Sequence, residues 1–491
     1  MAAQVNAGSS LLERPRTFWF AALLIALLFG GTNLPWKLDD YDQAKQAFTS
    51  FEMVNGGNWL FQHTPNGRIA TKPPLVGWSS VLTYGATRDW NVAWRLPSIA
   101  AALALATILT RTAASAYGRT AALIAMSAFG LNLLSPRLAT LVRTDMALAL
   151  VVFLIGLLIW KKIRSGSAWN SRDRGVMFAL LTASMLIKGP IVYAFLLPGI
   201  LAFTWWRRGS MEAGTAWCGW WPWIASLAVF LSWAAAGIAW VPGFHEQVVL
   251  REFAGRFSET VHRPQPLYFY LPHLLHKFAP WSILGIAVAV LGWRGQSGSF
   301  TERARQISPE IAWLVCWSLG GLIVMSLIPS KRVDRIFPVV PPLCLLLAAG
   351  VSQLSTVAPR VIRWSTVALL SACVFSGAYG AQRVVISYRS GDDGLVRFAE
   401  QVRRGAVMNG WRYEVIGGSE EGLLLYLRRT RFLKADEAVA RWNGGELDAL
   451  VMPADDAPRL LASLPDATET SLEGAITIND RARKYVLLKR R

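Results

Sequence analysis

Long apolar segments alternate with short polar segments along most of this chain. Four of them read FWFAALLIALLFGGTNLPW, MALALVVFLIGLLIW, WIASLAVFLSWAAAGIAWV and IAWLVCWSLGGLIVMSLI. A helix needs roughly 20 residues, or about 17 at the short end, to cross the hydrocarbon core of a bilayer. The pattern therefore predicts a polytopic α-helical membrane protein. The first segment begins at Phe18 and is long for a signal-peptide core, so we expect it to be retained as a helix.

The composition supports a membrane protein and argues against a nucleic-acid partner. Hydrophobic residues make up 53% of the chain and charged residues only 16%, compared with about 25% charged residues in soluble domains. The net charge is +19, and the 23 tryptophans lie in or beside the apolar segments, as interface anchors do. Nucleic acid would require a basic groove with stacking aromatics. We expect the positive charge to meet anionic membrane lipids instead.

Basic loops predict which segments share a face of the membrane. Loops 161–175, 205–210, 293–306 and 358–364 are basic, which is typical of the cytoplasmic side. The segments that alternate with them then lie on the outer face: 37–74, the one holding Lys188, 243–278 and 329–335. A last span near 364–382 places the C-terminus outside and requires an odd number of spans. Residues 74–145 are ambiguous, so we expect about 11 or 13 spans and favour 13.

The composition changes after about residue 382, and this divides the chain into two domains. Residues 1–382 form the predicted transmembrane catalytic domain. Residues 383–491 mix amphipathic helices with short apolar strands and predict a small soluble α/β domain of ordinary size on the outer face. We expect this domain to have a structural or substrate-shielding role.

The first outer loop, 37–74, carries charged residues at helical spacing. Asp42, Lys45 and Glu52 recur with apolar residues between them, which predicts an amphipathic helix along the membrane interface. Asp42 and Lys45 are three positions apart and can form an exposed ion pair or part of a site. Lys72 precedes two prolines. It can extend to water, as boundary lysines do, or bind the phosphate of a lipid-linked substrate.

Further ionisable residues interrupt apolar segments on the same predicted face. Asp145 can cap the helix that follows it or belong to a site, and Lys188 lies between two apolar stretches. Buried ionisable residues in spanning segments are costly and suggest function. The other candidates are Arg137, Lys331 and Arg335. Acids and bases from separate segments thus converge on one face, as a phosphate-handling site beside an acceptor requires.

The loop 243–278 holds four of the five histidines together with Arg256. Its histidines, His262 included, form no compact metal-ligand motif, so we expect no metal site from them alone. The loop can instead gate access to a site between membrane and water. All four cysteines lie in apolar segments and lack ligand spacing, which is typical of small buried hydrophobes.

An ordered set of motifs resembles the membrane glycosyltransferases of the GT-C class. It is most similar to the branch of the aminoarabinose transferases and protein O-mannosyltransferases. The resemblance covers roughly residues 15–380. Its pieces are Asp42 with Lys45, Glu52-Met53, Gly57-Asn58-Trp59, Lys72-Pro73-Pro74, Arg95–Ser98, Tyr117–Arg119, Arg137–Thr140, Asp145-Met146, Lys188–Pro190, His262 and Ser330–Pro342.

The resemblance implies a GT-C fold in the bacterial inner membrane, with the site on the periplasmic face. It implies transfer of a sugar from a polyprenyl (undecaprenyl) phosphate donor, with inversion, to an acceptor such as lipid A or another envelope glycolipid or glycan. Asp42 takes the place of the catalytic carboxylate and Asp145 that of the second acid. Lys45 and Lys72 take the places of donor-phosphate contacts, and Lys188 that of the lysine of the Lys-Gly-Pro motif. Arg137, Lys331 and Arg335 are further candidates for the donor phosphate, and Arg256 and His262 for a substrate loop.

Two departures from the family pattern bear on the chemistry. Thr71 stands where the aminoarabinose transferases have a glutamate that partners a histidine at a metal position. We therefore expect no required cofactor, with His262 a weak metal candidate. Asp334-Arg335 replaces an aromatic pair, which leaves the sugar open. Two alternatives also stay open at this point: a protein O-mannosyltransferase, and a transporter or flippase of a lipid-linked sugar.

Overall fold

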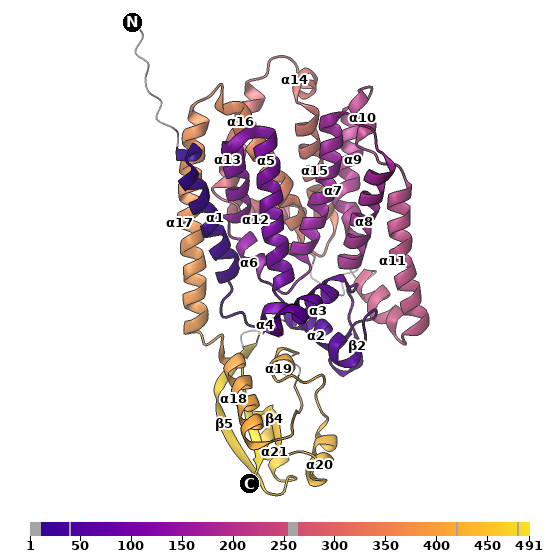
Figure 1. The fold of residues 1–491 in the computed structure, drawn as a ribbon, viewed down its shortest axis with the longest axis vertical. Coiled ribbons are helices and arrows are strands. Elements are labelled where there is room, and N and C mark those ends of the chain that lie inside the picture. Colours follow the sequence, from indigo (N-terminus) through magenta and orange to yellow (C-terminus); the bar gives the residue numbers. More distant parts are fainter. Residues whose placement is uncertain (1–10, 39–40, 254–263, 419–420, 479–480) are drawn as a thin grey trace.

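A computed structural model describes residues 11–38, 41–253, 264–418, 421–478 and 481–491. A bundle of long helices forms one end of the molecule and a small α/β domain the other, with a layer of short helices between them (Figure 1). The predicted arrangement of a helical membrane protein with a C-terminal α/β domain is confirmed.

The bundle consists of apolar helices. They are α1 (Pro15–Gly31), α5 (Leu96–Gly130), α7 (Asp145–Ser165), α8 (Ser171–Lys188), α9 (Ile191–Trp206), α11 (Trp221–Trp240), α13 (Trp281–Arg294), α15 (Pro309–Leu327), α16 (Val340–Ser355) and α17 (Arg360–Arg389). Among the described residues, six helices are long and apolar enough to cross a membrane, or seven if one bent pair counts as a span. Helices α1 and α9 are apolar but shorter. The chain is a multi-pass membrane protein.

Helix α5 doubles back at Gly118, where its backbone is non-helical with φ +88°. Beside the turn, the Ser352 hydroxyl donates to the Tyr117 carbonyl over 2.8 Å. At the other end, the Ser98 hydroxyl donates to the carbonyl of Leu141, which follows α5, over 2.8 Å. The start of α5 and the residues that follow α6 therefore lie together, so the chain turns back within the bundle at Gly118. The exact number of spans stays a prediction.

Glycines bring α9 and α15 into close contact. A Cβ on Gly320 would lie 2.6 Å from the backbone nitrogen of Gly199, so only glycine fits at this crossing. Small residues permit such close backbone approach in membrane bundles. Because α9 follows Lys188 and α15 leads into residues 330–335, this contact fixes two segments of the site described below.

Short elements cover the end of the bundle that faces the α/β domain. They include α2 (Tyr41–Gly56), the hairpin β1 (His63–Thr64) and β2 (Arg68–Ile69), α3 (Leu75–Thr87), α4 (Trp90–Ala93) and α6 (Ser135–Ala139). The remaining short helices of the membrane part are α10 (Met211–Thr215), a π-helix (His245–Phe253), α12 (Tyr270–Lys277) and α14 (Phe300–Gln306). Short 3-10 helices span Leu11–Glu13, Pro65–Gly67, Leu267–Phe269 and Val333–Val339.

The α/β domain is built on a four-stranded sheet in the order β3-β4-β6-β5. Strands β3 (Tyr413–Val415) and β4 (Ala449–Pro453) pair in parallel, whereas β6 (Arg481–Arg490) pairs antiparallel with β4 and with β5 (Ala467–Ile478). Its helices are α18 (Gly394–Asn409), α19 (Glu421–Tyr426), α20 (Ala435–Asn443) and α21 (Ala457–Leu461), with a 3-10 helix at Ala454–Asp456. Helix α17 extends to Arg389, and the division at residue 382 stays a prediction.

Helix α2 is covered by the α/β domain. Its buried residues Ala44, Phe48 and Phe51 belong to one hydrophobic core together with Phe398 and Leu424 of that domain. The sequence predicted an amphipathic helix lying along the membrane interface. The helix is present at the predicted place, but its apolar face packs on protein, because α18 and α19 supply the apolar surface that lipid was expected to provide.

Candidate active site

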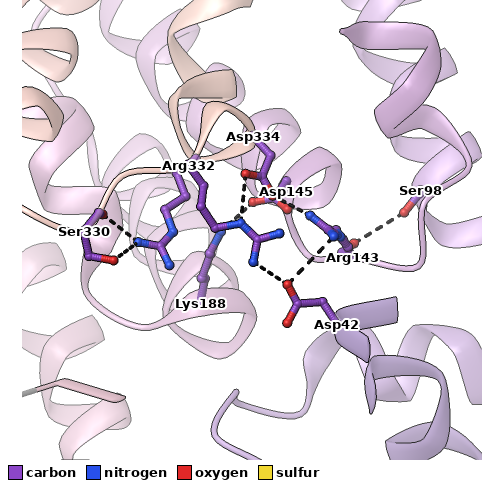
Figure 2. A network of polar contacts seen from close by, with 9 residues as sticks. Asp42, Ser98, Arg143, Asp145, Lys188, Ser330, Arg332 and Asp334 are labelled. Atoms are coloured by element: carbon purple, nitrogen blue, oxygen red, sulfur yellow. Dashed lines mark hydrogen bonds and ion pairs between the residues drawn. The ribbon is translucent and has the colours of Figure 1, made fainter. Parts of the chain in front are cut away.

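Charged side chains from four segments meet at the end of the bundle nearest the α/β domain. They come from the start of α2, from residues 143–145, from the end of α8 and from residues 330–335 (Figure 2). The sequence predicted that these segments share one face of the membrane, and the structure brings them together.

Asp145 and Lys188 form a buried ion pair. Lys188 Nζ lies 2.5 Å from Asp145 Oδ1, and Asp145 is only 5% exposed. Asp145 is the first residue of α7 and Lys188 the last residue of α8. A helix dipole favours an acid at its N-terminus and a base at its C-terminus, so both helices stabilise this pair. Removal of one partner would leave an uncompensated buried charge.

Asp42 lies beside two guanidinium groups. Its carboxylate accepts a hydrogen bond from Arg332 Nη1 and lies 3.8 Å from Arg143 Nη2. Both arginines also contact Asp334: Arg143 Nη1 lies 2.6 Å and Arg332 Nε 3.5 Å from its carboxylate oxygens. Carboxylates and guanidinium groups thus alternate in space. The side chain of Asp42 stays 35% exposed, so a substrate can reach it.

The surroundings of Asp42 keep its carboxyl group ionised. Burial acts to raise its pKa, but the hydrogen bond and charge of Arg332, followed by the charges of Lys72 and Arg143, hold the pKa below its usual value. A carboxylate with a lowered pKa is a weak base. In this state Asp42 is better suited to orienting an acceptor than to removing its proton.

Lys72 lies beside the same cluster, after β2 and ahead of α3. Burial, together with the charge of Lys188, lowers the pKa of its ammonium group to about 8, against the opposing effect of Asp145 and Asp42. Among the residues that the structure describes, Lys72 makes no hydrogen bond or ion pair. The group is therefore a half-buried cation that is available to an anionic ligand.

Several predicted site residues have other contacts. Lys331 Nζ donates to the Gln265 carbonyl over 2.8 Å. Arg335 donates to the carbonyl and hydroxyl oxygens of Ser330, at 2.7 and 3.0 Å. Lys331 therefore ties the segment 330–335 to residue 265, and Arg335 holds its own loop in place; neither contacts Asp42 among the described residues.

Among the described residues, the Arg137 side chain makes no hydrogen bond or ion pair with the cluster. Arg137 is exposed on α6, where its carbonyl oxygen accepts a hydrogen bond of 2.6 Å from Asn33 Nδ2. Lys45 is half-buried on α2, three residues after Asp42. The predicted substrate-loop residues Arg256 and His262 lie outside the described residues.

In the segment 330–335, the residue that contacts Asp42 is not one of the two candidates for the donor phosphate, and the roles of Lys331 and Arg335 at that phosphate stay predictions. Arg332, rather than Lys331 or Arg335, contacts Asp42, and Asp334 links Arg332 to Arg143. Asp334 lies in the first turn of a 3-10 helix, and Arg332 precedes that helix in extended backbone. In the sequence, Arg332 stands two positions before Asp334. This spacing does not by itself show which basic side chain of the segment points toward Asp42.

Two residues of the Arg-Leu-Pro-Ser motif hold the segments of the site in place. The hydroxyl group of Ser98 donates to the carbonyls of Leu141 and Arg143, at 2.8 and 3.4 Å. Arg95 is 1% exposed and donates to the Trp36 carbonyl, which also accepts a 3.1 Å hydrogen bond from Tyr426. The segment leading into Asp42 is therefore fixed from the bundle and from the α/β domain.

Within the described ranges, no group of three or more His, Cys, Asp or Glu side chains could hold a metal ion. His262 lies outside these ranges, so the expectation about a metal stays a prediction.

No protein-family model matches the chain, but individual relatives do. It is 26% identical over 323 residues to the undecaprenyl phosphate-alpha-4-amino-4-deoxy-L-arabinose arabinosyl transferase of Shewanella sediminis, which covers 65% of this chain and 57% of that protein. It is 27% identical over 364 residues to a transferase of the same description from Sodalis glossinidius, covering 69% and 60%. The chain thus spans less than two thirds of these relatives' length.

Solved structures show the same fold. ArnT from Cupriavidus metallidurans bound to undecaprenyl phosphate superposes with a TM-score of 0.67 at 17% identity, over 96% of this chain and 97% of that one. The oligosaccharyltransferase AglB from Archaeoglobus fulgidus, in complex with an inhibitory peptide and a dolichol-phosphate, gives 0.52 at 12% identity, over 90% and 69%. The predicted resemblance to the GT-C class is confirmed, and the chain has the GT-C fold.

Proposed function

We propose that this protein is an inverting glycosyltransferase that takes its sugar from undecaprenyl phosphate or a similar polyprenyl phosphate. The acceptor would be lipid A or another glycolipid or glycan of the bacterial envelope. The relatives named above act, by their descriptions, on an undecaprenyl phosphate-linked sugar. The observation that carries the proposal is one cluster in which exposed Asp42 lies beside Arg143 and Arg332, next to Lys72.

The cluster suits the charge that develops during such a transfer. An acceptor oxygen attacks the anomeric carbon from the side opposite the phosphate. The bond from that carbon to the phosphate oxygen breaks, and its electron pair stays on the departing polyprenyl phosphate. Fixed cations stabilise that negative charge in a half-buried site, and Lys72 and Arg332 are placed to supply them.

Asp42 would orient the acceptor. Its contact with Arg332 implies an exchange on binding, because a donor phosphate that takes Arg332 releases the carboxylate toward the acceptor. For a hydroxyl acceptor, the proton then passes to Asp42 or to water. For an acceptor that is itself an ionised phosphate, no proton has to be removed, and Asp42 would act by position alone.

The charge of the loops supports a periplasmic site in the bacterial inner membrane. The basic loops 161–175, 205–210 and 293–306 adjoin α10 and α14 (Figure 1). These helices lie at the end of the bundle opposite the α/β domain, and short basic loops favour the cytoplasm. The Asp42 cluster and the α/β domain would then face the periplasm.

We propose that this transfer proceeds without a metal cofactor. Thr71 offers a hydroxyl group where the related pattern has a carboxylate, and a hydroxyl is a poorer ligand for a divalent cation. The cations of the cluster carry the stabilising charge instead.

The test uses purified protein in liposomes with lipid A and undecaprenyl phosphate carrying a radiolabelled sugar. The proposal expects label in the acceptor together with an equal amount of released undecaprenyl phosphate. The Arg332→Gln variant should lose most of both, whereas Arg404→Gln, which alters a 78% exposed cation on α18 of the α/β domain, should retain them. Movement of intact donor across the membrane without release of undecaprenyl phosphate would support the transporter alternative and refute transfer.

A further inference from the structure

A cavity lies at the opposite end of α2 from Asp42. It is a cleft of about 1260 Å³ between the C-terminal half of α2, the β1–β2 hairpin and the α/β domain. Ligand sites usually measure about 300–1,000 Å³, so the cleft has room for an extended ligand. Glu52, which lines the cleft, lies ten positions after Asp42 on α2, or about 15 Å along the helix. The cleft is therefore distinct from the Asp42 cluster.

The α2 wall of the cleft holds polar groups that lack partners. Glu52 is only 8% exposed. Its carboxylate accepts a hydrogen bond of 2.5 Å from Asn58 at Oε1 and interacts with the backbone N–H of His63. Its Oε2 nevertheless has no partner with full hydrogen-bond geometry among the described residues, and neither has Nδ1 of His63 on the same wall. A buried acceptor without a donor is unfavourable, because the group has lost its hydrogen bonds to water. A ligand that donates hydrogen bonds would recover this cost.

The opposite wall comes from the α/β domain and carries both signs of charge. Arg431 and Glu437 form an ion pair of 2.5 Å, and Lys434 and Arg459 line the cleft with exposed side chains. Acidic residues Asp436 and Asp456 line it as well. Acids and bases are therefore nearly balanced in the cleft, although the whole chain carries a net charge of +19.

This balance selects the chemistry of the ligand. A phosphorylated lipid or a polyanion would require an excess of cations, which the Asp42 cluster provides and this cleft does not. The cleft is bounded by the α/β domain, which lies on the side of α2 away from the bundle (Figure 1). A polar, nearly neutral ligand in water fits these surroundings. Hydroxyl groups both donate and accept, and they match the carboxylates and amides of Glu52, Asn55 and Asn58.

A peptide fits less well. Extended peptides are commonly captured by adding a strand to a free sheet edge. Strand β3 is the edge strand nearest the cleft, but its continuation is already paired, since Leu433 donates to the Val415 carbonyl over 2.8 Å and bridges to Ile416. The cleft therefore offers no open strand for peptide addition.

We propose that this cleft binds an oligosaccharide, with Glu52 accepting hydrogen bonds from its hydroxyl groups. The Glu52-Met53 motif, which the transfer chemistry leaves without a role, then belongs to a glycan-binding site. The binding does not depend on the proposed transfer, because it requires neither donor nor reaction. If the transfer takes place, the bound glycan is the water-exposed part of the acceptor.

The test measures binding of full-length protein in nanodiscs to an array of bacterial envelope oligosaccharides, with a peptide array in parallel. Thr430→Trp places a large ring into the cleft from an exposed position, and it should abolish glycan binding. Val407→Trp adds the same ring to an 85% exposed position outside the cleft and should leave binding unchanged. Glu52→Gln, which keeps the side-chain shape, should weaken binding about tenfold or more.

Three outcomes would overturn the proposal: no glycan is bound, glycan binding survives Thr430→Trp, or only peptides are bound in a Thr430-dependent way. Asp42→Asn separates this inference from the proposed function. Glycan binding should be the same in that variant, whether or not transfer is lost.

Discussion

Gly422 lies where the α/β domain meets the segment that leads into Asp42. A Cβ at this position would overlap the carbonyl oxygen of Leu38, well inside the 3.0 Å that such atoms keep. Alanine forms helix better than glycine by about 1 kcal/mol, but overpacking a filled contact costs about 1–3 kcal/mol. In Gly422→Ala we therefore expect the cost of overpacking to exceed the gain in helix propensity. The Leu38 backbone should then shift by on the order of 1 Å.

This shift should reduce catalysis more than donor binding. Leu38 lies four residues before Asp42, and a misplacement of about 1 Å can cost on the order of 100-fold in rate. Lys72 and Lys188, which the donor phosphate would meet, are held by other segments. In single-turnover transfer assays of Gly422→Ala, we expect the rate to fall up to about 100-fold, with donor affinity changed little.

The matched control is Gly377→Ala, since a methyl group at Gly377 would meet nothing within 4 Å. It should transfer sugar at the native rate. If Gly422→Ala also transfers at the native rate with native stability, the α/β domain does not position Asp42, and the reasoning is wrong. An equal loss of rate and of donor affinity would instead indicate general misfolding.

Three further predictions concern single charges of the cluster. Arg332→Gln removes the leading cause that lowers the pKa of Asp42, so the acid limb of the rate–pH profile should move to higher pH. Lys72, with a pKa of about 8, is charged below that pH and loses its charge above it. Donor affinity, measured by titration, should therefore fall above pH 8 in the native protein, whereas Lys72→Arg should keep its affinity there. Asp145→Asn should lower the free energy of unfolding by about 3–5 kcal/mol because it leaves Lys188 unpaired; thermal unfolding should show recovery when Lys188→Met is added.

The sequence identified individual charges of the site better than their pairing. Asp145 and Lys188 stand out because charges inside apolar segments are costly. Their contact could not be predicted, since they are 43 residues apart and meet through the packing of α7 and α8. Asp42 and Lys72 were found through motifs in the first outer loop, and the structure places both at the cluster.

The remaining features depend on tertiary structure. The turn of the 3-10 helix at Val333–Val339 decides that Arg332 points at Asp42, while Lys331 binds the carbonyl of Gln265 and Arg335 binds its own loop. The amphipathic pattern of α2 predicted a covered apolar face, but the pattern is the same whether lipid or protein covers it. Only the fold shows that α19 lies there, and this places the α/β domain next to Asp42.

The most direct test of transfer at the Asp42 cluster compares native protein with Asp42→Asn. Both are reconstituted with undecaprenyl phosphate carrying a radiolabelled sugar and with lipid A, and donor binding is measured in parallel. The account predicts label in the acceptor with native protein, and a loss of transfer on the order of 100-fold or more in Asp42→Asn with donor binding retained. Undiminished transfer by Asp42→Asn would contradict the assignment of this cluster as the site of transfer.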